Sequence, residues 1–482
     1  MIPPSTLSEK QTENGQIIRT EKFVRNSGSY KIADIVEKVQ SHMKTTHDSQ
    51  LTGRKTALIS GAGIAGLAAA FELNAKGFDV VIAENRDEFS RFNILTLKME
   101  VQAFLKKFSL LEEFEKSVAA RIEDHQKIIF RKESIQSNPP SNVSKLQFEG
   151  PLDKDSIKFK NFFKEHGIYC VQIKDLQAFL AQKAAQLGVQ ILSGCDIKFF
   201  TTIEKERVSK VEIRQKNESS SPLIFEPDLF FIAEGTHPIS AQQLEMVNDS
   251  EDIVNNACTG ENWVFGNLSY HGDKTFVVSM IMTAQKTLQI ANVIFNAKSQ
   301  VVNVAVTSNE NLNHDDIVRL ILTTAKKVFD YKGITEPPKI IEIVKKPTKI
   351  TNQIASLCSK GNIFRIGDAV GHSSPLAGLG GTLGLTLVPF TIEQLLDDYQ
   401  KGSDELHSRF KTHSQAYVKT WIDKSESVKE SILGIFDGDQ SSEIEPKKPT
   451  PLATQLKFLD KSVLNRLYCL IKGIHHERSC AL

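Results

Sequence analysis

Several features that direct proteins to metals, disulfides or nucleic acids are missing from this sequence. The six cysteines are scattered, without a CxxC pair or metal-ligand spacing, so isolated thiols in a reducing compartment are expected rather than a disulfide framework. No two histidines stand four residues apart beside an acid, so no metal site is predicted. The formal net charge is only +1, and such a small field does not favour a nucleic acid as partner.

Long apolar runs are also missing. The N-terminus has no apolar stretch of the kind found in secretory signals, and no run reaches the roughly 18–20 apolar residues needed to cross a bilayer. We therefore expect the protein in the cytoplasm. Residues 452–482 are amphipathic and carry lysines among leucines. We expect this segment to pack against the folded domain, with a membrane contact as the alternative.

The length and composition indicate a folded protein of more than one domain. At 482 residues the chain exceeds what one hydrophobic core usually supports. Its residues are 40% hydrophobic and 24% charged, as in ordinary globular proteins. Residues 1–50 are predicted to be a polar N-terminal extension with one short helical pattern between Ile32 and Val39. Residues 396–482 are predicted to be a mainly helical C-terminal region.

A glycine turn between a strand and a helix is predicted at residues 56–84, which read TALISGAGIAGLAAAFELNAKGFDVVIAE. Two buried strands joined by a helix are typical of a parallel pair in an α/β fold. The glycines have GxGxxG spacing, which allows a tight turn, a close phosphate and a helix lying on the strand. The helix N-terminus would then face a pyrophosphate. The residues predicted to contact it are Gly61, Gly63, Ile64, Ala65 and Gly66.

Glu84 ends the second strand about 20 residues after the glycines, where an acid can accept hydrogen bonds from an adenosine ribose. A glycine turn without a ligand is the alternative, but the strand, the helix and this acid together favour a dinucleotide. A carboxylate here would repel a 2′-phosphate, so the motif leaves FAD and NAD as candidates.

A second glycine-rich segment lies near the other end of the chain. Residues 361–385 read GNIFRIGDAVGHSSPLAGLGGTLGL, a predicted strand followed by a loop. This segment resembles the GD motif of flavoprotein hydroxylases of the para-hydroxybenzoate hydroxylase type. The resemblance implies that Asp368 binds the ribityl chain of FAD and that the next helix N-terminus lies near the flavin. The cofactor-binding residues it implies are Gly367, Asp368, Pro375, Gly378, Gly380 and Gly381.

The segment after Glu84 is locally similar to the MICAL flavin monooxygenases. It reads ENRDEFSRFNILTL, and a later segment, IKDLQAFLAQKAAQLG, resembles a second MICAL stretch, with Lys174 in place of an arginine. The resemblance of these short segments adds Asn85, Arg86, Arg91, Asn93 and Lys174 to the predicted cofactor-binding residues.

Two departures from the hydroxylase pattern concern the nicotinamide cofactor. The usual DG motif reads Glu234–Gly235, and the following THPISAQQ contains no arginine. The familiar GDAAH reads GDAVG, with His372 displaced by one residue. Glu234 and Gly235 are still predicted to belong to the cofactor site. NADPH or NADH, the transient reductant that the resemblance implies, is expected to bind weakly.

We therefore predict an α/β protein with a Rossmann-like FAD-binding domain, an inserted mixed-sheet substrate domain and C-terminal helices. The FAD-binding domain would combine residues 51–100, 165–240 and 355–395, and the substrate domain residues 101–164 and 241–354. The resemblance implies a monooxygenase, in which NAD(P)H reduces FAD, dioxygen reacts at flavin C4a and one oxygen atom passes to an unidentified substrate. The alternatives are a flavin-dependent reductase or dehydrogenase of the same fold and a non-catalytic FAD-containing binding protein. No catalytic side chain can be assigned from the sequence.

Overall fold

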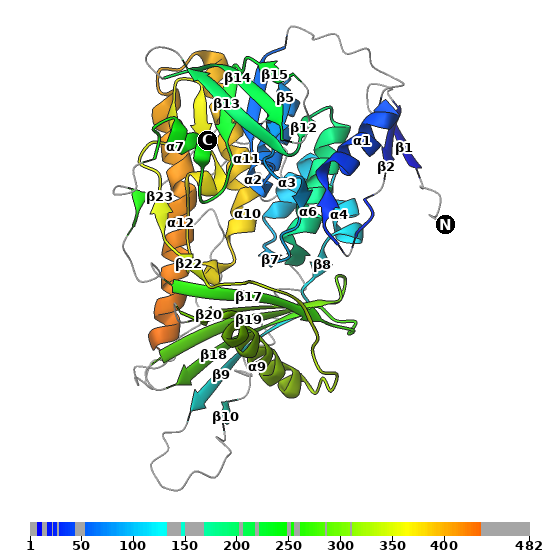
Figure 1. Cartoon of the computed structure of the whole chain (residues 1–482), viewed down its shortest axis with the longest axis vertical. Coiled ribbons are helices and arrows are strands. Elements are labelled where there is room, and N and C mark those ends of the chain that lie inside the picture. The colour runs from blue at the N-terminus through cyan, green and yellow to red at the C-terminus, as the bar shows by residue number, and fades with distance from the viewer. Residues whose placement is uncertain are drawn as a thin grey trace, which may run out of the picture.

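The computed structural model describes residues 7–11, 17–21, 23–26, 28–43, 54–132, 146–149, 168–201, 206–216, 221–247, 252–254, 261–284, 287–308 and 311–434. Two large sheets dominate it, one at each end of the view in Figure 1. The amphipathic segment 452–482 lies outside the described residues.

The first large sheet has six strands and carries the predicted glycine turn. Its strand order is β12-β5-β4-β16-β25-β24, parallel except for the β24–β25 pair. The strands are β4 (Thr56–Ser60), β5 (Asp79–Ala83), β12 (Gln190–Leu192), β16 (Leu229–Ile232), β24 (Ser359–Lys360) and β25 (Ile363–Arg365). The strand, helix and strand expected over residues 56–84 are thus confirmed.

Both faces of this sheet are covered because its strands are apolar on both sides. Ile59 faces a cluster formed with α2 (Ile64–Ala75), α6 (Ile173–Gln186) and α11 (Leu387–Lys401). Leu58 faces the other way, onto a three-stranded sheet of β13 (Cys195–Thr201), β14 (Val208–Gln215) and β15 (Leu223–Phe225). The alternation of side chains along one strand therefore supplies two hydrophobic cores.

The second large sheet has eight strands, and one helix of the described residues covers it. Its order is β10-β9-β18-β19-β20-β17-β21, with β22 also pairing with β17. The pairs are antiparallel except β9 with β18, so the sheet is mixed. The strands are β9 (Asp124–Lys132), β10 (Leu146–Glu149), β17 (Glu261–Ser269), β18 (Phe276–Ala284), β19 (Thr287–Asn296), β20 (Val301–Ser308), β21 (Ile340–Ile343) and β22 (Thr348–Ile350).

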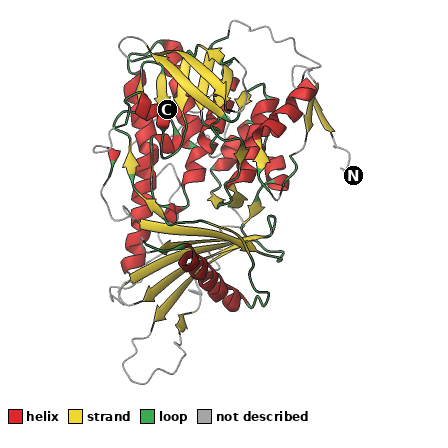
Figure 2. Cartoon of the chain, viewed as in Figure 1, coloured by secondary structure: helices red, strands yellow, loops and turns green. Residues whose placement is uncertain are grey.

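The helix on this sheet is α9 (His314–Lys332), and its ends follow from the sequence. Asn313 accepts a hydrogen bond from the N–H of Asp316 and so caps the first turn, and Gly333 ends the helix in the left-handed conformation. Ile317, Ile321 and Val328 point into the core between helix and sheet. Figure 2 shows this helix and sheet as a unit beside the other layers.

A smaller sheet lies between the two large ones. It consists of β7 (Ile94–Leu97), β11 (Tyr169–Gln172) and β8 (Ala120–Arg121), in the order β7-β11-β8. The apolar spacing of residues 171–187 predicts a helix, which is confirmed as α6 except at its start, since Val171 pairs with Leu95 in this sheet and α6 begins only at Ile173. Strand pairing outweighs the helical spacing of the first two residues.

Two short helices follow β7, namely α3 (Val101–Lys107) and α4 (Leu111–Ser117). They fall in the range predicted for the substrate domain. Phe104 and Phe114, however, are buried in the same cluster as the helices on the six-stranded sheet. The aromatic residues of this segment therefore belong to the core of the first sheet.

The N-terminal residues also enter that core. β1 (Leu7–Gln11) and β2 (Ile17–Glu21) form a hairpin, and β3 (Tyr30–Lys31) pairs with β6 (Glu88–Phe89). The expected helix is confirmed as α1 (Ile32–Met43), with Ile32 and Val36 buried.

The last described part of the chain consists of short strands and turns followed by helices. The segment 353–384 forms β23 (Gln353–Ile354), η1 (Gly367–Ala369), β26 (Gly371–His372), η2 (Pro375–Ala377) and α10 (Gly380–Gly384). After α11 comes α12 (Leu406–Gly434), the long helix that runs beside both sheets in Figure 1. A short helix, α7 (Ile239–Gln243), follows β16.

Candidate functional site

The glycine turn between β4 and α2 is built as a cradle with one open side. Gly61 has φ +106°, and a Cβ there would lie 2.6 Å from the carbonyl oxygen of Ala233 on β16's following turn. Gly66 is packed against the carbonyl of Gly61. At Gly63, by contrast, a Cβ would meet no protein atom closer than 3.7 Å. The fold itself therefore requires glycine at Gly61 and Gly66, whereas at Gly63 it leaves space for another molecule.

Gly63 is also the residue before the first turn of α2. No side chain caps this end of the helix, and its first turn contains no acid. The N–H groups of the first turn and the helix dipole therefore favour an anion beside the open side of the turn.

Glu84 lies at the end of β5 and already accepts hydrogen bonds from the protein. Oε2 accepts from the N–H of Ala62, 2.7 Å away, and Oε1 accepts from Nε of Arg86, 2.8 Å away. Burial raises the pKa of Glu84, but the hydrogen bonds and charge of Arg86 and the N–H of Ala62 outweigh it, so the pKa is lowered. The carboxylate is thus ionised and holds the glycine turn at its second residue.

The two predicted glycine-rich segments, residues 61–66 and 361–385, meet at the first turn of α2. A Cβ on Gly367, which has φ +60°, would lie 2.5 Å from the Cβ of Ala65. A Cβ on Gly384 would lie 3.3 Å from Ile64. The GD segment and α10 therefore approach the first turn of α2 closely, and glycine permits that approach.

Arg91 and Asp368 lie close enough for their charges to interact. Arg91 is exposed to solvent and Asp368 is half-buried. Nevertheless, burial lowers the pKa of Arg91, assisted by the charge of Arg86, and burial raises the pKa of Asp368, opposed by the charge of Arg91. Asp368 lines a cavity of about 50 Å³, and we refer to the region around Gly63, Glu84, Arg91 and Asp368 as the cleft.

The backbone beside Arg91 is held from three directions. The carbonyl of Arg91 accepts from the N–H of Lys174, and the carbonyl of Asn93 accepts from the N–H of Ile173. The carbonyl of Phe92 accepts from Nδ2 of Asn267 on β17, 3.0 Å away. The eight-stranded sheet therefore binds directly to the loop that positions the Arg91 guanidinium.

The glycine-rich loop after the GD segment packs on β7 and α12. A Cβ on Gly378 would lie 2.7 Å from Oγ1 of Thr96, and one on Gly381 would lie 2.7 Å from Leu95. A Cβ on Gly380 would lie 2.9 Å from the ring of Trp421. These three glycines permit three chain segments to converge. The helix expected after the loop, α10, has only five residues.

The chain can now be compared with known proteins. A family model described as the FAD binding domain matches residues 54–425. The chain belongs to this FAD-binding family. Accordingly, the protein is an FAD-dependent oxidoreductase.

Solved structures with the same fold include several FAD-dependent oxygenases. The chain is similar to PqsL of Pseudomonas aeruginosa, described as a probable FAD-dependent monooxygenase, with 14% identity, TM-score 0.56 and coverage of 80% of this chain and 100% of that one. It is also similar to p-nitrophenol 4-monooxygenase PnpA of Pseudomonas putida, with 14% identity, TM-score 0.58 and coverage of 87% and 97%. A third is aklavinone-11 hydroxylase with FAD and aklavinone, at 14% identity, TM-score 0.57 and coverage of 80% and 70%. A search of curated protein sequences gives no match.

The residues of the cleft fit FAD. The open side at Gly63 and the uncapped α2 N-terminus suit a pyrophosphate, and Glu84 suits a ribose. A cavity of about 640 Å³ is lined by Arg86, the ion-pair partner of Glu84, and by the residues that follow it. This volume is in the range of pockets that hold cofactors.

Other predicted cofactor residues make contacts within the protein. Asn85 is exposed and its amide donates to Asp196. Lys174 donates to the carbonyl of Gly28 in the N-terminal segment. Glu234 accepts from the hydroxyls of Ser60 and Ser240 and, at 2.8 Å, from the N–H of Ser240 at the start of α7. Gly235 has φ +82° and provides the turn between β16 and α7.

The structure adds residues that the sequence did not suggest. The hydroxyl of Tyr417 on α12 donates to Oδ1 of Asp368, 3.3 Å away. The N–H of Lys98 donates to Oγ1 of Thr382, which ties the end of β7 to α10. No local motif marks Tyr417 or Lys98, because their partners are distant in sequence.

The described part of the chain contains neither a candidate membrane span nor a candidate metal site. No helix there is long and apolar enough to span a bilayer. No group of three or more His, Cys, Asp and Glu side chains in the same residues is placed to hold a metal ion.

Proposed function

We propose that the protein is a monooxygenase that uses NADPH or NADH to reduce its FAD and transfers one oxygen atom from dioxygen to a substrate. Bound FAD supplies the redox and oxygen chemistry. The protein binds and orients the cofactor, holds the charges around it and provides the surface for the substrate.

The proposed cofactor contacts follow the cleft from one end to the other. Glu84 would accept hydrogen bonds from the adenosine ribose, and the α2 N-terminus at Gly63 would bind the pyrophosphate. Arg91 would add a positive charge near the phosphates. Asp368, oriented by Tyr417, would bind the ribityl chain, and the loop from Pro375 to Gly381 would lie beside the flavin ring.

The monooxygenase proposal rests on the fold shared with FAD-dependent monooxygenases, and the contact of Asn267 with Phe92 supports a substrate domain beside the flavin. This contact joins the eight-stranded sheet to the loop of Arg91 in the cofactor cleft. A second buried amide, Asn303, donates to Oδ1 of Asn267 at 2.8 Å and keeps that side chain oriented. A separate sheet fixed against a flavin cleft supports the assignment of that sheet as the substrate domain.

Purified protein tests the proposal through its spectrum and its oxygen consumption. A flavin spectrum that bleaches with NAD(P)H in the absence of oxygen and returns on aeration is expected, with oxygen uptake and an oxygenated product once the substrate is supplied. Product formation without oxygen uptake would favour the reductase alternative. A flavin that NADH and NADPH never bleach would favour the binding protein.

The local similarity to MICAL remains a prediction. It rests on residues 84–95 and 174–188 alone. The ammonium of Lys174 donates to the carbonyl of Gly28, and its backbone N–H donates to the carbonyl of Arg91.

A further inference from the structure

A segment outside the family match contributes to the cofactor cleft. We use the term strap for residues 23–26 and 28–43, which precede the matched residues 54–425. Tyr30 pairs with Phe89 and the N–H of Ile32 donates to the carbonyl of Asp87, 3.0 Å away. These bonds fix the strap against the loop that immediately follows Glu84.

The strap forms part of the cavity beside Glu84. Lys31 and Ala33 line this space of about 640 Å³ from the strap, and Arg86, Ser90 and Ser193 line it from the six-stranded sheet and its loops. Ser29 donates to Oε2 of Glu88 at 2.6 Å and further closes the strap onto this loop. The cavity beside the proposed ribose contact therefore has one wall that is not part of the family's matched region.

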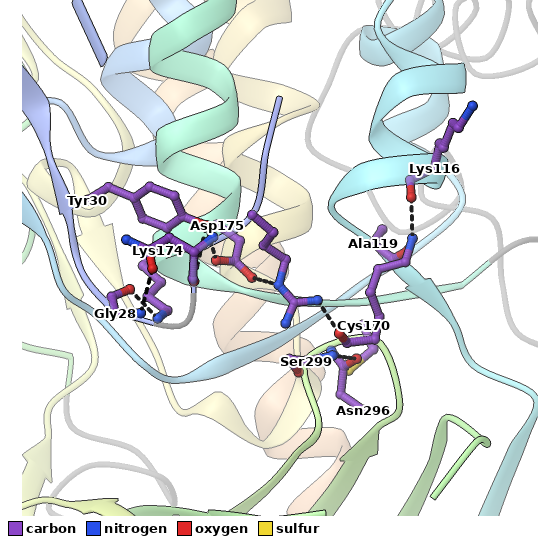
Figure 3. Close-up of polar contacts among 12 residues, drawn as sticks. Gly28, Tyr30, Lys116, Ala119, Cys170, Lys174, Asp175, Asn296 and Ser299 are labelled. Carbon is purple, nitrogen blue, oxygen red and sulfur yellow. Dashed lines mark hydrogen bonds and ion pairs between the residues drawn. The ribbon is translucent and has the colours of Figure 1, made fainter. Parts of the chain in front are cut away.

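The strap is also bound to the first turn of α6. Asp175, only 1% exposed, accepts a hydrogen bond from the hydroxyl of Tyr30 at 2.8 Å and an ion pair from Nε of Arg25 at 3.0 Å (Figure 3). Burial raises the pKa of Asp175, and Arg25 and Tyr30 oppose this effect. Two residues later, Gln177 donates to the carbonyl of Ala62 in the glycine turn, 3.1 Å away. Helix α6 thus connects the strap to the glycine turn between β4 and α2.

The same arginine reaches the eight-stranded sheet. Arg25 donates to the carbonyl of Lys298 in the turn between β19 and β20. The ammonium of Lys298 in turn donates to the carbonyls of Glu115 and Ala119, both at 2.6 Å, around the end of α4. Figure 3 shows these contacts around Ala119, Lys116 and Asp175. The side chain of Arg25 therefore joins the strap to α6 and to the eight-stranded sheet.

We propose that the strap is a structural wall of the adenosine end of the FAD site and that Arg25 is a positioning residue that couples FAD binding to the placement of the eight-stranded sheet. The inference rests on the proposed placement of the ribose at Glu84. A ligand that binds only when the strap is packed in place stabilises that packed state. FAD should therefore hold the strap in place, and the strap should slow the release of FAD.

Proteolysis of the wild-type protein provides the first test. Trypsin cleaves after Arg and Lys, and the part of the strap before α1 contains Arg25 and Lys31. We expect saturating FAD to slow cleavage at these two residues at least fivefold, while cleavage at the exposed Lys326 of α9 changes less than twofold. Equal cleavage of the strap with and without FAD would overturn the proposal.

Flavin titration of two apoprotein variants provides the second test. Arg25→Gln removes the ion pair with Asp175, and we expect the Kd for FAD to rise at least tenfold. Arg54→Gln removes an exposed pair with Asp79 at the start of the matched domain and should change the Kd less than twofold. A Kd for Arg25→Gln within twofold of wild type would reject the role of Arg25.

The ribose placement has its own control in the same titration. Glu84→Gln should weaken FAD binding whether or not the strap contributes. Loss of affinity in Glu84→Gln with unchanged affinity in Arg25→Gln would reject the strap proposal alone. Unchanged affinity in Glu84→Gln would instead reject the placement on which it rests. Should Arg25→Gln not fold, the wild-type proteolysis still decides the outcome.

Discussion

Gly367 and Ala65 come from opposite ends of the family match, yet a Cβ on Gly367 would lie 2.5 Å from the Cβ of Ala65. This close approach fixes the GD segment on the first turn of α2. It also makes the cofactor cleft a product of tertiary packing, since neither segment can form the site alone. The first prediction follows from this contact.

Replacing Gly367 by alanine should reduce the FAD content of the purified protein by more than half. The new methyl group meets Ala65, and the backbone at φ +60° disfavours any side chain by about 1 kcal/mol. Gly402→Ala is the matched control, since its φ is +64° and no atom lies within 4 Å of the added Cβ. The control should lose some stability and keep its flavin, measured as the ratio of flavin to protein absorbance. Equal flavin in both variants would contradict the proposed contact between GD segment and cofactor.

Gly63→Ala should leave the apoprotein intact and weaken FAD binding. The added Cβ lies at least 3.7 Å from any other protein atom, and φ is −69°, which alanine adopts readily. Any loss of affinity must therefore come from the ligand's approach. We expect an apoprotein Tm within about 2 °C of wild type, from a change below roughly 1 kcal/mol, and a Kd raised at least tenfold. An unchanged Kd would show that the pyrophosphate does not lie at this turn.

Glu84→Arg should lose FAD on dilution and dialysis. The change removes two ribose hydrogen bonds and places a positive charge beside Arg86, at a cost to binding on the order of 2–4 kcal/mol. Glu336→Arg reverses an exposed charge and serves as the control. Retention of full flavin by Glu84→Arg would disprove the ribose contact.

The lowered pKa of His372 should make the stability of the folded protein fall at acidic pH. Burial, together with a smaller effect of the nearby His237, lowers the pKa of His372 from 6.5 to about 4. The folded protein therefore takes up this proton later than the unfolded chain as the pH falls, so stability is lost between about pH 6.5 and 4, by about 3 kcal/mol at most. His372→Gln should show a smaller drop in Tm between pH 7 and 4.5 than wild type. His271→Gln, at an exposed ion pair worth little, should retain the wild-type slope.

Much of the fold could be predicted because its elements carry local signals. The GxGxxG turn requires glycine for backbone reasons, and the helix α9 has a cap at both ends. Alternation in β18 and β20 likewise predicts sheet. Each of these signals lies within a few residues of the structure that it specifies.

The contacts that complete the cleft could not be predicted from local sequence patterns, because they join residues that are far apart in the sequence. Tyr417 reaches Asp368 from α12, and Asn267 reaches Phe92 from β17. The strap lies within residues 1–50, for which the sequence predicts a polar extension with one short helical pattern. Its apolar residues Ile32 and Val36 are nevertheless buried in the core that also covers the six-stranded sheet. Composition alone therefore understated the part that this segment plays in the core.

The last prediction concerns reduction by NAD(P)H. The carboxylate of Glu234 accepts hydrogen bonds from Ser60 and Ser240 and so fixes the start of α7. The residues that follow, 236–243, contain no arginine to meet the phosphates of a nicotinamide cofactor. Loss of one charge-assisted contact is worth about 1.5–3 kcal/mol, or roughly ten- to a hundredfold in affinity.

We therefore expect slow bleaching of the flavin in anaerobic stopped-flow mixing with NADPH, with a high apparent KM. Without substrate, the slow aerobic turnover should yield mainly hydrogen peroxide. His237 stands in the turn before α7 and lines a cavity of about 50 Å³ that also touches Asp368. His237→Arg should accordingly raise the rate of reduction at low NADPH, whereas Lys339→Arg, remote on the eight-stranded sheet, should not. Rapid, saturable reduction of the wild type at micromolar NADPH would show that another basic group already meets the cofactor, and the missing arginine would then be of no consequence.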